Sequence, residues 1–330
     1  MRTDAVVFAG KADARVGELE MPPPQAGQVL IRTFFSTVSC GTEGWLLRNQ
    51  YYWHPTQYPC VPGYQRVGEI IEIGPDVHGW KIGEKVFATI GQWNADVCPM
   101  WGSHAAVANT AATELYRLPE GVDDIDASAA VVAQVGYNAA NRIAASPGDW
   151  VAVFGDGLIG QCGAQAARAR GLRAIVVGHR PARMRLAAQF SADAVVDGGK
   201  EDVVVAVRKL TGSNYVTAVI DAVHGTAVQE QYLPLLARGG QIVYSGLSAG
   251  ETWANMAFLL RQELTTHFVS GWTRQRMEAT LNLMSVGKMR IRPLITHLVS
   301  YRQAPEIWKM ILGKQDDHLG VSFQWEEAYK

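Results

Sequence analysis

Apolar residues in the first third of the chain fall in short runs separated by glycine and proline. The runs lie at 5–8, 29–31, 67–74 and 85–88, and turn-forming residues such as P-P-P-Q-A-G-Q at 22–28 stand between them. Short apolar runs with this spacing are typical of antiparallel strands. They predict a β-rich, partly barrel-like domain at the start of the chain.

The pattern changes at residue 123 to an alanine-rich stretch that favours a helix and ends at Ser146-Pro147-Gly148. Apolar runs then alternate with helical segments, and this alternation indicates a parallel sheet covered by helices on both faces. After residue 271 we predict a helix, a strand at 294–300 and a final helix. The strands of the parallel sheet are expected at 151–154, 174–177, 194–196, 218–222, 242–245 and 267–271.

The chain is organised around V-A-V-F-G-D-G-L-I-G-Q-C-G at 151–163, an apolar run that leads into glycines and then into small residues. A dinucleotide site needs one glycine for the turn, one for close approach of the pyrophosphate and one for helix–strand contact. The helix that follows offers free N–H groups and a partial positive charge to phosphates. The alternative is an ordinary glycine turn. The predicted cofactor-binding residues of the loop are Gly155, Gly157, Leu158, Ile159 and Gly160.

Composition and charge narrow the class of partner. The chain has 330 residues, 48% of them hydrophobic and 18% charged, with a formal net charge of −1. This balance gives no reason to expect nucleic acid or an anionic membrane, so a small-molecule substrate is favoured. No apolar stretch approaches the roughly 20 residues that span a bilayer, and we expect a cytoplasmic protein. The four cysteines, without CxxC spacing, predict neither a zinc knuckle nor a disulfide framework.

The order of these features resembles the medium-chain dehydrogenase/reductase family. The specific matches are V-P-G-Y-Q-R-V-G-E-I-I-E-I-G at 61–74, W-K-I-G-E-K-V at 80–86, the glycine loop, L-A-R-G-G-Q-I-V at 236–243 and P-L-I-T-H-L-V-S at 293–300. The resemblance implies an α/β protein with two domains. A GroES-like, β-rich catalytic domain would comprise residues 1–122 and 272–330, and a Rossmann domain with a doubly wound parallel sheet would comprise residues 123–271. Family habit implies a homodimer.

Zinc-dependent members of this family hold the metal with a cysteine, with the histidine of a G-H-E motif and with a later ligand. Cys40 matches the cysteine, but G-H-E reads Gly63-Tyr64-Gln65 here, and the later ligand has no obvious counterpart near 131–134. One thiolate and a neutral phenol cannot build a tetrahedral zinc site. We therefore predict no metal.

The end of the second strand of the parallel sheet predicts which cofactor binds. An acidic residue there would accept hydrogen bonds from the ribose and repel a 2′-phosphate, but the sequence has Gly178 followed by His179, Arg180 and Arg183. Guanidinium groups suit phosphate, so NADP(H) is expected. The alternative is that these basic residues only solvate the start of a helix. Further cofactor contacts are predicted at Asn138, Asp221, Ala222, Ser245 and Gly246.

Without a metal, a side chain must exchange the proton while the nicotinamide exchanges hydride. Thr42 matches the proton-relaying Ser or Thr of the zinc-containing relatives, and Tyr64 stands in the place of the zinc-binding histidine. Glu43 completes an S-x-G-T-E motif that resembles a zinc-less subgroup including bacteriochlorophyllide dehydrogenases. His54 is a further proton-transfer candidate. The alternatives are a turn hydroxyl for Thr42, a volume filler for Tyr64, an ion-pair partner for Glu43 and a structural role for His54.

Two aromatic-rich stretches, 45–58 and 91–104, match regions that border the substrate cleft in relatives. They predict a pocket for a bulky or flat substrate, and packing between the two domains is the alternative. The candidate pocket residues are Tyr51, Tyr52, Trp53 and Trp93.

The leading hypothesis is a zinc-independent, NADP(H)-dependent oxidoreductase that interconverts a secondary alcohol and a ketone. A quinone or enoyl reductase, which adds hydride to an activated double bond, is the first alternative. A non-catalytic NADPH-binding protein is the second.

Overall fold

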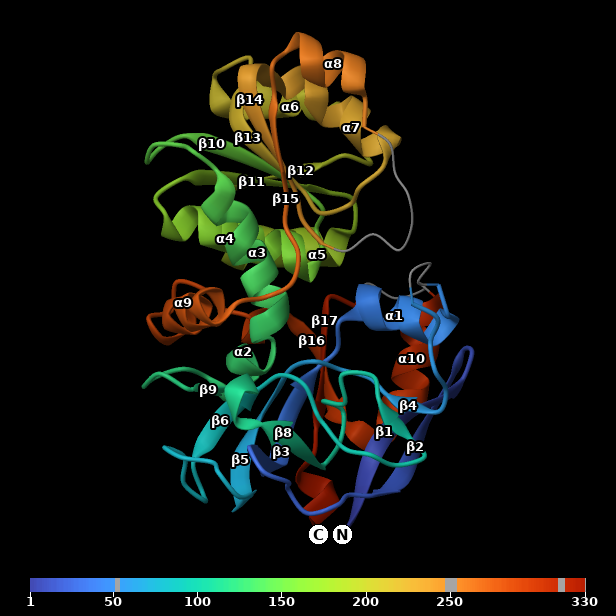
Figure 1. Ribbon diagram of the computed structural model, residues 1–330. Coiled ribbons are helices and arrows are strands. Elements are labelled where there is room, and N and C mark those ends of the chain that lie inside the picture. Colours follow the sequence, from blue (N-terminus) through green and yellow to red (C-terminus); the bar gives the residue numbers. More distant parts are fainter. Residues whose placement is uncertain (51–53, 247–253, 314–317, 330) are drawn as a thin grey trace. The chain divides into compact units, whose positions relative to one another are not determined.

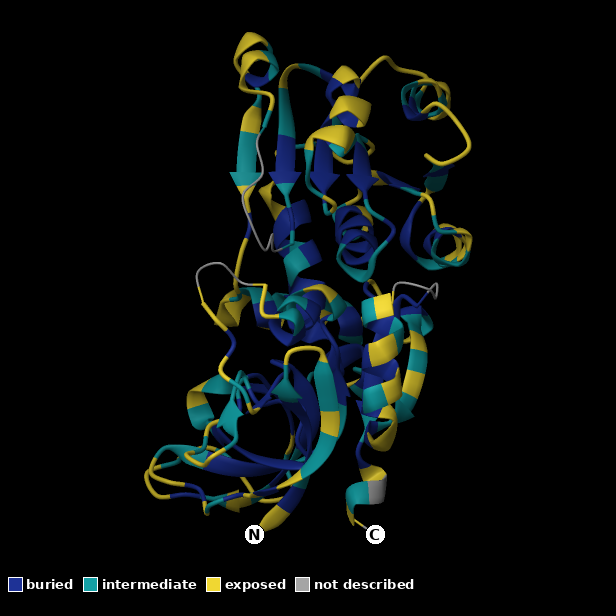
Figure 2. Ribbon diagram, turned by 90° about the vertical axis from the view of Figure 1, so that its right-hand side faces the viewer, coloured by how far each residue is buried: buried dark blue, intermediate teal, exposed yellow. Residues whose placement is uncertain are grey.

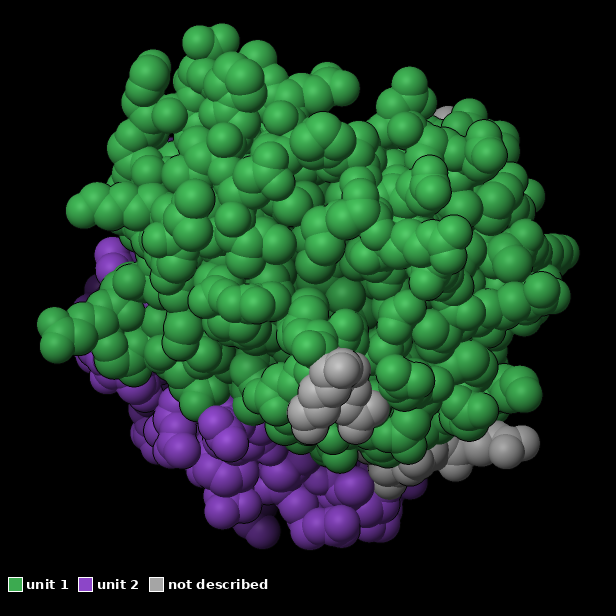
Figure 3. Space-filling model, turned by 90° about the horizontal axis from the view of Figure 1, so that it is seen from below, with its two compact units in different colours: residues 1–131, 295–330 green, residues 132–294 purple. Residues whose placement is uncertain are grey.

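The computed structural model describes residues 1–50, 54–246, 254–313 and 318–329. The chain forms two compact units, Met1–Val131 with Ile295–Lys330 and Val132–Leu294, which Figure 1 shows as ribbons and Figure 3 shows in separate colours. The sequence predicted residues 123–131 in the Rossmann domain and residues 272–294 in the catalytic domain, whereas each range lies in the other unit of the structure. The domain bounds remain a prediction. None of the helices among the described residues is long and apolar enough to cross a membrane.

The second unit contains a parallel sheet in the strand order β12-β11-β10-β13-β14-β15. Helices lie on both faces of this sheet (Figure 1), so the predicted doubly wound α/β fold is confirmed. Each predicted strand overlaps an observed one, and the central strands are buried (Figure 2) because apolar residues face helices on both sides. The strands are β10 (Trp150–Phe154), β11 (Arg173–Gly178), β12 (Ala194–Asp197), β13 (Val216–Asp221), β14 (Leu236–Tyr244) and β15 (Thr265–Phe268).

The first unit contains the predicted short, mainly antiparallel strands. A four-stranded sheet has the order β2-β1-β4-β7, and a seven-stranded sheet runs β16-β17-β3-β5-β6-β9, with β8 paired to β3. The strands are β1 (Arg2–Gly10), β2 (Asp13–Glu20), β3 (Gln28–Thr37), β4 (Cys60–Val61), β5 (Arg66–Ile73), β6 (Lys85–Ala88), β7 (Cys98–Pro99), β8 (Val107–Ala111), β9 (Leu115–Arg117), β16 (Ile295–Ser300) and β17 (Gly320–Gln324).

The alanine-rich stretch predicted as helical forms two helices, α2 and α3, that are separated at Ala129. Before this break, the Ser128 hydroxyl donates to the carbonyl of Ile125 and lies 2.7 Å from the Thr37 hydroxyl on β3. The α-helices are α1 (Cys40–Arg48), α2 (Asp124–Ser128), α3 (Ala130–Arg142), α4 (Leu158–Ala169), α5 (Pro181–Leu186), α6 (Val203–Thr211), α7 (Thr226–Tyr232), α8 (Met256–Arg261), α9 (Arg274–Ser285) and α10 (Ala304–Gly313).

The C-terminal segment completes the core of the first unit. Trp308 on α10 packs edge-on against Phe8 on β1, with ring centroids 5.1 Å apart, and Trp325 stacks on Tyr301 at 4.7 Å. Both tryptophans are almost fully buried. Burial of such large apolar surfaces stabilises the unit, so its two chain segments, far apart in sequence, share one core.

Candidate functional site

The glycine loop joins β10 to α4 in the second unit. Gly155 has φ +121°, a conformation that side chains other than glycine rarely adopt, and a Cβ on Gly160 would overlap the carbonyl oxygen of Gly155. A Cβ on Gly157 would meet nothing within 4 Å. The loop thus brings α4 close to the strand and leaves open space beside Gly157. It fits the cradle that a dinucleotide pyrophosphate needs.

A cleft of about 670 Å³ opens at the carboxyl ends of the parallel strands. Its volume is in the range of small-ligand sites. Of the predicted cofactor residues, Gly155, Gly178 and His179 line it, whereas Arg180 and Arg183 are not among its lining residues. The described residues that line the cleft are Phe154, Gly155, Asp156, Val177, Gly178, His179, Gly198, Gly199, Val223, His224, Gly225, Thr226, Ala227, Val228 and Gln231.

Asp156 is a lining residue that the sequence reasoning did not single out. Its Oδ2 accepts hydrogen bonds from the backbone N–H groups of His179 (3.0 Å) and Arg180 (2.9 Å). Its Oδ1 lies 3.6 Å from the Arg183 guanidinium. An acidic residue between two loop glycines was the available signal in the sequence, although its partners depend on the fold.

Asp221 ends β13 as predicted, and its carboxylate is hydrogen-bonded within the protein, while its predicted cofactor contact stays untested. The side chain has no exposed surface. Oδ1 accepts from the backbone N–H groups of Val223 and His224, and Oδ2 accepts from the Tyr232 hydroxyl at 3.0 Å. Burial and the neighbouring Asp221 charge raise the pKa of Tyr232, which keeps this hydroxyl a donor. Asp221 therefore shapes the loop that begins at Ala222.

A smaller pocket of about 250 Å³ lies at the ends of β14 and β15 and includes Gly246 and His224. The neighbouring Ser245 Oγ is buried and has no hydrogen-bond partner among the described residues. An orphaned hydroxyl at the end of a strand suits a polar ligand group, because an unmet buried donor is costly. The predicted Asn138 is buried on α3. Together with the glycine cradle, these features fit a nicotinamide dinucleotide.

In the first unit the structure brings Thr42, Glu43 and Tyr64 together. Burial raises the pKa of Tyr64 well above its ordinary value, the nearby Glu43 charge raises it further, and hydrogen bonds with the Ser39 and Thr42 side chains oppose the shift. The Tyr64 ring also meets Trp101 edge-on, with centroids 5.4 Å apart. The phenol is therefore a neutral hydrogen-bonding group near neutral pH, held by hydroxyls at the start of α1.

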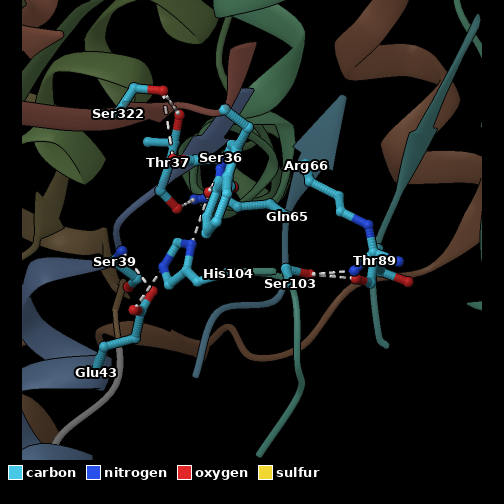
Figure 4. Close-up of polar contacts among 11 residues, drawn as sticks. Ser36, Thr37, Ser39, Glu43, Gln65, Arg66, Thr89, Ser103, His104 and Ser322 are labelled. Carbon is cyan, nitrogen blue, oxygen red and sulfur yellow. Dashed lines mark hydrogen bonds and ion pairs between the residues drawn. The ribbon is translucent and has the colours of Figure 1, made fainter. Parts of the chain in front are cut away.

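Glu43 is paired with the buried imidazole of His104 (Figure 4). The Nε2 atom of His104 lies 2.9 Å from Glu43 Oε2, and both side chains are fully buried. Glu43 Oε1 accepts from the backbone N–H of Ser39 at 2.8 Å. On the other side of the imidazole, Nδ1 lies 2.8 Å from Ser36 Oγ. Because a carboxylate only accepts, Nε2 carries a proton and Glu43 is held in one orientation.

The same imidazole packs beneath the turn that carries Tyr64. Gly63 has φ +90°, and a Cβ there would stand 2.7 Å from the His104 ring. His104 thus contacts the backbone before Tyr64 and hydrogen-bonds the acid beside it. A glycine at 63 is needed both for the conformation and for the space.

Arg66 is a second buried charge in Figure 4, in the strand that follows Tyr64. Its guanidinium donates to the carbonyl of Gly102 (3.3 Å), to the hydroxyl of Ser103 (3.4 Å) and to that of Thr110. Burial lowers the pKa of Arg66 to about 10. These bonds anchor the segment that carries His104.

Other predicted site residues lie elsewhere or outside the description. His54 is exposed, and its Nδ1 lies 2.9 Å from the carbonyl of Pro55, so the structure shows no hydrogen bond joining it to Tyr64 among the described residues. Trp93 donates to the carbonyl of Val97 at 2.9 Å and covers Gly91 and Gly102. This packing gives Trp93 a structural place, and its predicted substrate contact stays untested. The remaining predicted pocket residues, Tyr51, Tyr52 and Trp53, lie outside the described residues.

The residues that match the metal ligands of zinc-dependent relatives make other contacts here. Gln65 is buried, donates to the carbonyl of Thr37 at 3.0 Å and accepts from the backbone N–H of Val131 at 3.1 Å. Cys40 is a half-buried thiol near Tyr64. Within the described ranges, no three His, Cys, Asp or Glu side chains are grouped as metal ligands would be. The absence of zinc stays a prediction.

Comparisons with known proteins match both units. Residues 25–120 match the family model of the alcohol dehydrogenase GroES-like domain, and residues 159–285 match that of the zinc-binding dehydrogenase. An alcohol dehydrogenase of Geobacillus stearothermophilus is 26% identical over 311 residues, covering 88% of this chain and 90% of that protein.

Two solved structures agree with the fold over almost the whole chain. A zinc-binding dehydrogenase of Sinorhizobium meliloti bound to NADP has a TM-score of 0.85 at 20% identity, covering 98% of this chain and 99% of its own. An alcohol dehydrogenase of Escherichia coli in complex with NADH has a TM-score of 0.84 at 20% identity, with coverage of 98% and 99%. At these identities the likeness establishes the fold of both units.

Proposed function

We propose, since the chain belongs to the medium-chain dehydrogenase/reductase family, that it is an oxidoreductase interconverting a secondary alcohol and a ketone with NADP(H) and without catalytic zinc. The observation that carries this proposal is the buried Tyr64 phenol beside Thr42, in the position of the zinc-binding histidine of relatives. A neutral hydroxyl pair can bind a substrate oxygen and exchange its proton without a metal.

The cofactor, when bound, supplies or accepts the hydride. The N–H groups at the start of α4 would bind its phosphates across the open face of Gly157. During ketone reduction, Tyr64 would donate its proton to the forming alkoxide oxygen. The Ser39 and Thr42 hydroxyls would then stabilise the phenolate, which regains a proton from solvent, and the Glu43 charge favours the protonated phenol. His104 keeps Glu43 fixed throughout.

A substrate panel tests the reaction class. We expect turnover of secondary alcohols with NADP⁺ and of the matching ketones with NADPH. The high pKa of Tyr64 gives a specific reason to keep a second candidate, a quinone or enoyl reductase, because hydride addition to an activated double bond needs no strong acid. Turnover of enones or quinones alone would reject the first reaction in favour of the second. Tight NADPH binding without turnover on either panel would indicate the non-catalytic alternative.

The preference for NADP(H) is supported by the end of β11. Gly178 carries no carboxylate there, and the exposed His179 lines the cleft with Arg180 next in the chain. The two solved relatives, one with NADP and one with NADH, do not favour either cofactor. Fluorescence titration should show NADPH binding at least about tenfold more tightly than NADH. Tighter binding of NADH would contradict this preference.

The absence of zinc is testable on purified protein by elemental analysis. We expect less than stoichiometric zinc, because Gln65 is hydrogen-bonded within the fold and Tyr64 is a neutral phenol. Tightly bound zinc at one ion per chain would overturn this part of the proposal.

We also propose a cytoplasmic homodimer. Among the described strands, β15 lies at the edge of its sheet, and its last residue, Phe268, is 77% exposed. Leu260 on α8 is 72% exposed. Exposed apolar groups beside an unpaired strand edge favour pairing with a second copy. Light scattering that gives the mass of one chain would contradict the dimer.

A further inference from the structure

Asp156, the acidic residue within the glycine loop, bears on the choice between NADH and NADPH. Asp156 lies between Gly155 and Gly157 and is only 5% exposed, yet it borders the cleft at the end of β10. Both carboxylate oxygens point toward the turn between β11 and α5, where they meet two backbone N–H groups and one guanidinium. The negative charge therefore lies at the strand end that normally discriminates between the two nicotinamide dinucleotides.

Asp156 also fills the space that a side chain at residue 178 would need. A Cβ on Gly178 would stand 2.5 Å from the Asp156 Cβ and 2.6 Å from its Oδ2. The carboxylate that many dinucleotide sites place at the end of the second strand is thus replaced by one that reaches the same spot from the glycine loop. Residue 178 has to be glycine in this arrangement, because any larger residue would collide with Asp156.

Arg183 is the cation that balances this charge. Its Nη1 lies 3.6 Å from Asp156 Oδ1, and the two side chains are 16% and 7% exposed. Gln161 on α4 fixes the same region by donating to the carbonyls of Asp156 (3.0 Å) and Arg183 (3.2 Å). A guanidinium held by a carboxylate attracts a phosphate less than an unneutralised one, because the pair has almost no net charge.

We propose that Asp156 is a specificity-determining residue that limits the affinity for the 2′-phosphate of NADP(H) by neutralising Arg183 and by occupying the donors at the β11–α5 turn. This inference rests on the proposed dinucleotide cofactor. His179 and the chain that follows would still receive the 2′-phosphate in the wild-type protein. Removal of the Asp156 charge would add Arg183 to that site.

The test is the ratio of NADH to NADPH dissociation constants, measured by fluorescence titration of the full chain. Asp156→Asn keeps an oxygen that can accept from the two N–H groups but removes the charge. We expect this ratio to rise about tenfold over wild type, with NADH affinity almost unchanged. In the double variant Asp156→Asn/Arg183→Met the gain should disappear.

Asp202→Asn is the matched control. Asp202 is an exposed N-cap whose Oδ1 accepts from the backbone N–H of Val205, so the change removes one charge and keeps the cap. The ratio should stay at the wild-type value. If Asp156→Asn does not fold, Arg183→Met alone carries the test, because an unbalanced Asp156 should lower the ratio below wild type.

An unchanged or lowered ratio in folded Asp156→Asn would overturn the inference, as would an unchanged ratio in Arg183→Met. The cofactor preference of the wild type is judged separately, from its dissociation constants for NADH and NADPH. A wild type that prefers NADH would contradict the NADP(H) proposal and leave the expected rise on Asp156→Asn standing.

Discussion

Glu43 and His104 form a buried polar pair. Replacement of either side chain is expected to lower the stability of the protein. Neither side chain is exposed, and each has a further polar partner, Ser39 for the acid and Ser36 for the imidazole. Removal of one partner from such a pair leaves the other buried without its bond. The pair thus couples the start of α1 to the segment that precedes β8.

Glu43→Gln should lower the free energy of unfolding by about 1–3 kcal/mol, since the buried imidazole and the Ser39 N–H lose their carboxylate acceptor. Urea denaturation measures the change. Glu278→Gln is the control: it removes an equal charge from an exposed pair with Arg274 on α9 and should cost less than about 1 kcal/mol. Equal losses of unfolding free energy in the two variants would show that the buried pair stabilises the protein no more than the exposed pair does.

Tyr64→Phe should reduce turnover of the alcohol or ketone substrate by about 100-fold or more, because it removes the proposed proton donor and little volume. The Michaelis constant should change much less than the rate constant. Tyr58→Phe is a matched control, since the Tyr58 hydroxyl donates to the carbonyls of Leu46 and Leu47 within the same unit. Its turnover should equal that of wild type. Normal turnover in Tyr64→Phe would show that Tyr64 only fills space and donates no proton.

Some of these residues could be predicted from the sequence and others could not, for a physical reason. Thr42, Glu43 and Tyr64 match motif positions of the family, so the resemblance, rather than spacing, suggested that they meet. The partner of Glu43 is 61 residues away, and the N–H groups that bind Asp156 are 23 and 24 residues away. Such contacts depend on how loops fold back, which local pattern does not encode.

At the scale of elements, the parallel strands were the most predictable part of the chain. Their continuous apolar runs reflect burial on both faces, a requirement that is local and strong. The break between α2 and α3 at Ala129 was not visible, because the alanine-rich sequence favours a helix throughout. The contact of Ser128 with Thr37 on another strand accompanies that break.

Two glycines of the cofactor loop should respond differently to alanine. Gly160→Ala would place a methyl group against the Gly155 carbonyl, so we expect a loss of about 2 kcal/mol or more in stability together with weaker cofactor binding. Gly157→Ala meets open space, so stability should hold while NADPH affinity falls, because the methyl group stands where the phosphates approach. Thermal denaturation and fluorescence titration separate the two effects. Equal melting temperatures for both variants would contradict this account.

For the whole molecule, the least predictable feature was the joining of distant segments into one unit. β17 pairs with β3 in antiparallel register and with β16 in parallel, so the C-terminal residues complete a sheet begun near the N-terminus. The sequence predicted strands that overlap β3 and β16 but none at β17, and strand register depends on contacts across almost the full chain length. The family resemblance, rather than the pattern, suggested this return.

The stability of the whole chain should fall in alkaline solution through Cys60. Burial raises the pKa of this thiol from 9.0 to about 12, with a further contribution from Cys98. A raised folded-state pKa means that the unfolded chain loses its proton first, so the stabilising contribution is complete below about pH 9 and is lost as pH rises toward 12.

Cys60→Ala should therefore show a shallower decrease in unfolding free energy between pH 9 and pH 11 than wild type, apart from the constant cost of the lost side chain. Cys98→Ala is the comparison, because that thiol is half-buried and less desolvated, and it should flatten the curve less. Identical slopes in wild type and Cys60→Ala would show that the thiol does not titrate differently in the folded state.

The place where α3 meets α4 has a consequence for motion. A Cβ on Gly136 would overlap the backbone at Gly163, so the two helices touch main chain to main chain with no side chain between them. Neither helix can tilt or fray locally at this crossing without lifting the other. Amide hydrogens on both sides of the contact should therefore exchange with solvent through one shared opening event, with matched opening free energies, although they belong to separate helices.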